Sequence, residues 1–137
     1  MVTRAHAEGA RGQPLHRVDP RELLLGQRVF IRTLLASGFE GYDVDYRRGT
    51  STYFHASEPS VQLALPASHA TVAPAFHASE VERAVREAQT QAPGYTYAGF
   101  CAKVQAAGCA GYMVSFLGKR VVYFGRTAET HVEHFPQ

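Results

Sequence analysis

The sequence predicts an α+β fold: two tandem copies of a helix followed by an antiparallel β-hairpin form one domain, with the helices packed on one sheet face. Two observations carry this prediction. Seven positions recur at an offset of 70 residues without a gap. In each copy, a helical spacing of apolar residues also gives way to a strand-like spacing at the same point. The recurring pairs are Gly38 and Gly108, Gly41 and Gly111, Tyr42 and Tyr112, Val44 and Val114, Tyr46 and Phe116, Tyr53 and Tyr123, and Phe54 and Phe124.

The chain divides into an N-terminal arm and one domain. Residues 1–17 show no apolar period and contain glycine and proline, so we predict a mobile arm. Residues 18–137 form the single α+β domain, whose two copies cover about 20–66 and 79–137. A repeated unit of this size shares one composite core with its neighbour.

Three helices are expected. Asp19 can cap the first helix, which should end before Gly38. Ser79 and Glu82 have the spacing of a capping box and predict the start of the second helix at Ser79. The third helix is expected over residues 96–107.

Each copy should continue as a β-hairpin with one extra strand. In the first copy, a turn at Arg48 and Gly49 would place Val44 opposite Tyr53. In the second copy, a turn at Gly118 and Lys119 would place Val114 opposite Tyr123, which is the same cross-strand pair. The extra strands are expected over residues 61–65 and 130–135.

Composition excludes few functions. The chain has 14 basic and 12 acidic residues, so net charge gives no reason to expect binding to nucleic acid or to a membrane surface. Cys101 lies toward the start of one predicted helix and Cys109 lies just beyond its end, too far apart for a disulfide, and both are expected to be reduced core thiols. Because no apolar run has the length of a signal or membrane segment, we expect a cytoplasmic protein.

Three stretches of the second copy resemble one known family. They are AGCAGY at residues 107–112, KRVVYFGR at 119–126 and HVEHFP at 131–136. The family consists of small bacterial proteins of unknown function, often labelled phage envelope proteins, and the resemblance extends over residues 19–137. It implies an α+β domain of bacterial or prophage origin, with no established activity, cofactor or catalytic residue.

His131, Glu133 and His134 form a polar run that is able to bind zinc or nickel, or to move protons near neutral pH. On a strand, however, His131 and Glu133 share one face and His134 lies on the other. A metal would need a ligand from elsewhere, and the other histidines of the domain include His55, His69 and His77. We therefore favour a polar terminal strand, with no metal and no other cofactor.

The predicted hairpin tips are basic. Arg47 and Arg48 lie at the first tip, and Lys119 and Arg120 lie at the second. If the tips met, they would form one basic surface for phosphate groups. Charged turns are also common simply because turns are solvated, and we favour that interpretation.

Two further groups have a functional and a structural interpretation. Asp43 and Asp45 would lie about 7 Å apart on one strand face, as an acid and a base require. The second copy has Met113 and Ser115 at these positions, so we favour a solvated sheet face.

The four recurring tyrosines could line a binding site for an aromatic ligand or pack within the sheet, and we favour packing.

Three functions follow, in order of preference. The first is a non-enzymatic binding or interaction module whose partner is another protein. The second is a metal-binding or acid/base enzyme that uses His131 and Glu133. The third is a weak nucleic-acid binder that uses the basic tips. An exposed apolar patch would favour the first, three convergent ligands the second, and a continuous basic ridge the third.

Overall fold

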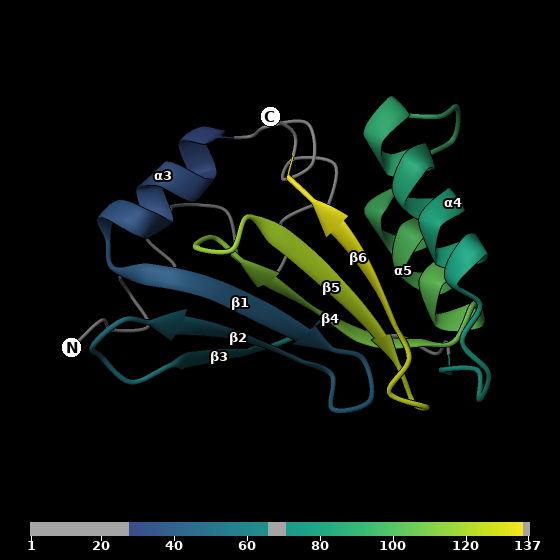
Figure 1. The fold of residues 1–137 in the computed structure, drawn as a ribbon, viewed down its shortest axis with the longest axis horizontal. Helices are drawn as coiled ribbons and strands as arrows, with labels where there is room; N and C mark the ends of the chain where they lie inside the picture. Colours follow the sequence, from purple (N-terminus) through teal and green to yellow (C-terminus); the bar gives the residue numbers. More distant parts are fainter. Residues whose placement is uncertain (1–27, 66–70, 136–137) are drawn as a thin grey trace.

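A computed structural model of the chain describes residues 28–65 and 71–135. Within these ranges the α+β class is confirmed, because three helices accompany a six-stranded sheet (Figure 1). The predicted arm and the expected start of the first helix at Asp19 lie outside the described residues. The elements in chain order are α3 (Arg28–Ala36), β1 (Phe39–Asp45), β2 (Thr50–His55), β3 (Val61–Ala64), α4 (Ala78–Thr90), α5 (Tyr97–Ala106), β4 (Cys109–Ser115), β5 (Arg120–Gly125) and β6 (Thr130–His134).

The sheet is antiparallel throughout, with strand order β3-β2-β1-β4-β5-β6. Each predicted hairpin and its extra strand form one half of the sheet. The two halves meet where β1 pairs with β4 at the centre. A Cβ atom at Gly41 would lie 2.2 Å from the carbonyl oxygen of Val114, and one at Gly111 would lie 2.3 Å from that of Val44. The close approach of these two strands therefore explains why both positions are glycine.

The predicted register is wrong by two residues in each hairpin. The observed pairs are Tyr42 with Tyr53 and Val44 with Ser51 in the first hairpin, and Tyr112 with Tyr123 and Val114 with Val121 in the second. Both hairpins have the same register, but it is not the predicted one. Because the shift is an even number of residues, each side chain still points to the predicted face.

Loop length is the reason for this shift. Residues 46–49 and 116–119 form four-residue loops, whereas the prediction assumed two-residue turns. In the first loop, Asp45 Oδ1 accepts hydrogen bonds from the backbone N–H groups of Arg47 and Arg48, both at 3.0 Å. In the second loop, Ser115 Oγ accepts one from Gly118 N at 2.8 Å. The side chain before each loop thus stabilises the longer turn.

All three described helices contribute to one core. Their buried side chains pack against the inward residues of the strands in a single cluster, so they cover the same sheet face. Figure 1 shows α3 near β1, and α4 with α5 on the side of β6. No helix in the described ranges is long and apolar enough to span a membrane. The helical core residues are Leu34, Val81, Ala84, Val85, Ala88, Phe100 and Val104.

Helix starts follow the sequence in one case of two. The third helix was expected from residue 96, and Thr96 is the N-cap of α5, whose side chain accepts a hydrogen bond from Gly99 N at 2.9 Å. The predicted cap of α4 at Ser79 is wrong, because the helix begins at Ala78 and Ser79 lies in its first turn. The capping residue is His77, whose backbone N–H donates to the Ala107 carbonyl at 2.8 Å. This tertiary contact outweighs the local capping-box signal.

Candidate functional site

The polar run of β6 divides between the two sheet faces as predicted. His131 pairs with Tyr123 and Glu133 with Val121, so both point toward the helices, whereas His134 is exposed on the other face. His131 Nε2 lies 2.6 Å from one carboxylate oxygen of Glu133.

The second carboxylate oxygen of Glu133 binds the helix layer. It accepts a hydrogen bond from Arg86 Nη1 of α4 at 3.0 Å, and Glu133 is buried. This bond raises the pKa of the Arg86 guanidinium, which therefore stays charged. Arg86 also pairs with Glu82 at 3.2 Å. The network attaches α4 to the edge strand β6, which is a structural role for Glu133.

Of the histidines proposed as further metal ligands, His55 and His77 lie in the described ranges, and neither of them joins this network. His55 Nε2 lies 2.8 Å from the Ser37 carbonyl, while Nδ1 receives the backbone N–H groups of Ser57 and Glu58. These contacts place the proton on Nε2 and occupy both ring nitrogens. His69 lies outside the described residues. Within residues 28–65 and 71–135, no group of three or more His, Cys, Asp and Glu side chains is arranged to hold a metal ion.

The two basic tips lie at opposite ends of the sheet (Figure 1). The reason is that β1 and β4 are antiparallel neighbours, so their C-terminal loops point in opposite directions. The paired stretch from Gly41 to Asp45 alone spans about 13 Å of strand. Arg47 and Arg48 therefore form no joint surface with Lys119 and Arg120.

Asp45 belongs to the turn and does not form a reactive pair with Asp43. Besides its two backbone hydrogen bonds, the Asp45 carboxylate lies 3.6 Å from the Arg48 guanidinium.

The recurring tyrosines are confirmed as packing residues. Tyr42, Tyr53, Tyr112 and Tyr123 are fully buried.

A shallow groove of about 340 Å³ lies between α4 and α5. Its floor is formed by alanines, and its rim is charged. The rim charges pair with one another: Arg83 lies 3.1 Å from Glu80, and Lys103 lies 2.6 Å from Glu87. The groove therefore presents little unpaired charge to a ligand.

The sheet face away from the helices carries a row of apolar side chains that the sequence did not reveal. We name Met113, Val122, Phe124 and Val132 the apolar strip. Met113 pairs with Val122 across β4 and β5, and Val122 pairs with Val132 across β5 and β6. Met113 is 49% exposed and Val132 is 39% exposed. One feature of the sequence could have indicated the strip. In β5 the residues that alternate with the buried ones, Val122 and Phe124, are apolar as well.

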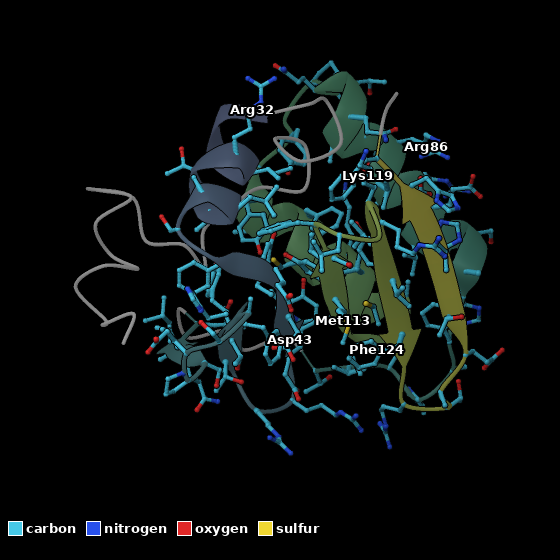
Figure 2. All side chains as sticks on the ribbon, turned by 60° about the vertical axis from the view of Figure 1, so that its left-hand side comes forward. Arg32, Asp43, Arg86, Met113, Lys119 and Phe124 are labelled. Carbon is cyan, nitrogen blue, oxygen red and sulfur yellow. The ribbon has the colours of Figure 1, made fainter. Side chains whose placement is uncertain are left out.

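Phe124 completes the strip by lying over a glycine. A Cβ atom at Gly111 would be 2.8 Å from Phe124 Cζ, so the ring rests on β4 at a position that has no side chain. Phe124 is therefore half-buried, and Met113 projects further out beside it. Figure 2 shows both residues near Asp43, on neighbouring strands of the sheet.

Asp43 borders the apolar strip. It lies on β1, paired with Met113 on one side and with Thr52 on the other. Burial raises the pKa of the Asp43 carboxyl above its ordinary value. Asp43 forms no ion pair with any residue of the described ranges.

The open sheet face thus combines exposed apolar area with one partly desolvated carboxylate. Within the described residues, this face does not pack against the helices, unlike the face that carries the Glu133 network and the tyrosines, and it is the candidate site. The chain matches no known protein-family model and no curated protein sequence.

Proposed function

We propose that the protein is a non-enzymatic interaction module that binds a segment of another protein on its open sheet face. The observation that carries this proposal is the apolar strip, which crosses β4, β5 and β6 on the face that the three described helices leave uncovered. Contiguous apolar surface of this kind marks interaction sites in soluble proteins.

The shape of the strip favours a protein segment over a small molecule. Small ligands bind in concave pockets that surround most of their surface. The strip is instead a row across three strands, about 10 Å wide at the usual strand spacing. A helix or an extended segment with apolar side chains covers such a row.

Charge favours a different protein over a second copy of this chain. Neither β1 nor β4 contains a basic residue. Arg120 of β5 also lies on the open face and would reach Asp43 only in an offset packing, whereas two copies packed with β1 and β4 directly over one another would cover Asp43 without supplying a cation to it. A buried unpaired carboxylate opposes such an interface.

Two further points belong to this proposal. The equal registers of the two hairpins support an origin by duplication of one unit. The resemblance of residues 107–112, 119–126 and 131–136 to the phage envelope family supports a bacterial or prophage origin.

The two alternatives have less support from the geometry. An enzyme centred on His131 and Glu133 would need a carboxylate that is not already paired with Arg86. A nucleic-acid binder would need more than two cations at each separate tip for substantial affinity, because each phosphate contact contributes only a small part of the binding free energy.

A selection from a phage-displayed library of random peptides tests the proposal. Peptides enriched on the wild-type protein should bind Met113→Glu about tenfold more weakly or worse, because a carboxylate replaces an apolar contact. Leu117→Glu is the matched control: Leu117 is 65% exposed in the loop after β4 and lies outside the strip. The selected peptides should bind Leu117→Glu as tightly as they bind the wild-type protein.

Two outcomes would contradict the proposal. One is that no peptide is enriched, or that the enriched peptides bind Met113→Glu as tightly as wild type. The other is a wild-type dimer in sedimentation experiments that Met113→Glu dissociates, which would make a second copy the occupant of this face.

A further inference from the structure

We infer that the partner segment presents a lysine or arginine side chain to Asp43, at the boundary between the apolar strip and β1. This inference rests on the proposed function, because it names the chemistry of the segment that covers the same face.

Asp43 lies within reach of a partner segment that packs on Met113. Asp43 and Met113 are direct cross-strand partners, and such side chains lie about 5 Å apart. A segment that packs on Met113 therefore reaches Asp43 as well. The distal side of Asp43 is bounded by Thr52 of β2, so the carboxylate lies between a polar and an apolar neighbour.

The chain itself supplies little compensation for the Asp43 charge. The groups that act on it are Thr52, which hydrogen-bonds to it, Asp45, which repels it, and Arg48, which attracts it. Arg48 is already engaged with Asp45 at the hairpin tip. The carboxylate is thus partly withdrawn from water without a dedicated cation.

Docking of an apolar segment would remove more water from this carboxylate. An ionised carboxylate that is covered without a partner costs several kcal/mol, whereas a cation opposite it restores the lost interaction. A lysine or arginine among apolar residues satisfies both the strip and Asp43. An uncharged apolar segment satisfies only the strip.

A double-mutant cycle tests the pairing. The probe is the tightest peptide from the wild-type selection, together with the same peptide in which its basic residue is replaced by glutamine. Asp43→Asn should weaken the basic peptide about tenfold, and the glutamine peptide should lose about the same factor on wild type. The two changes together should cause no further loss, because they remove one shared interaction.

Glu80→Gln is the matched control for net charge. Glu80 is an exposed acid on α4, on the helical side of the sheet, so its neutralisation should leave the affinity unchanged at physiological salt. An equal loss in Glu80→Gln and Asp43→Asn would overturn the inference, since it would show a long-range effect of charge.

The failures of the inference and of the proposed function are distinguishable. If the selected peptides are sensitive to Met113→Glu but bind Asp43→Asn as tightly as wild type, the inference fails and the interaction module stands. If they are insensitive to both changes, both proposals fail.

Asp43→Asn should keep the fold, which makes it a usable variant. The folded state raises the pKa of the Asp43 carboxyl above its ordinary value of 3.8. At pH values above this raised pKa, the ionised carboxylate therefore disfavours folding. The variant should therefore be at least as stable as wild type in urea at neutral pH. The difference should vanish below the ordinary value, where wild-type Asp43 is protonated in both states.

Discussion

Gly108→Ala is expected to lower the free energy of unfolding by more than about 3 kcal/mol, or to prevent folding. Gly108 joins α5 to β4 with φ at +91°, a backbone conformation that costs other residues about 1–2 kcal/mol. A Cβ atom there would also lie 1.9 Å from the carbonyl oxygen of Ala75. That segment has little freedom to retreat, because His77 N is bonded to the Ala107 carbonyl.

Gly49→Ala separates the backbone cost from the clash. Gly49 also has a positive φ, +70°, but nothing lies within 4 Å of a Cβ atom at this position. Gly49→Ala should therefore lower the free energy of unfolding only by the cost of the backbone conformation, about 1–2 kcal/mol. Urea denaturation followed by circular dichroism measures both variants. Equal losses of unfolding free energy in Gly108→Ala and Gly49→Ala would contradict the close approach of Ala75 to Gly108.

Val114→Asp is the second large effect that we expect. Val114 lies in β4 with 1% of its surface exposed, in the core formed with the helices. The aspartate would be buried among apolar side chains without an ion partner, at a cost of about 4 kcal/mol or more. The variant should be unfolded or insoluble when expressed.

Val132→Asp is the control for this change. It introduces the same side chain on the opposite sheet face, where Val132 is 39% exposed. It should remain folded, with a change in stability within about 1 kcal/mol. Comparable solubility and urea midpoints for Val114→Asp and Val132→Asp would contradict the assignment of the two faces.

The elements were predictable from sequence because they depend on local periodicity. Helix α5, the two extra strands and the inward tyrosines all follow from the spacing of apolar residues. The hairpin registers were not predictable in this way. They depend on loop length, and the hydrogen bonds of Asp45 and Ser115 that favour four-residue loops are not visible in a two-residue turn motif.

The candidate site required the strand order. Met113, Val122 and Val132 look like ordinary outward residues of three separate strands until their pairing is known. Asp43 becomes their neighbour only through β1 and β4, which are far apart in the chain. The same antiparallel pairing separates the basic tips, which the sequence alone left free to meet.

Methyl NMR of methionine-labelled protein tests the central claim most directly. The chain contains only two methionines, Met1 and Met113, so the spectrum reports on the apolar strip through one of two signals. On titration with the selected peptide, the Met113 methyl signal should shift and saturate with the Kd that an independent binding assay gives. A peptide that binds with this Kd while the Met113 signal stays unchanged would contradict the assignment of the open sheet face as the interaction surface.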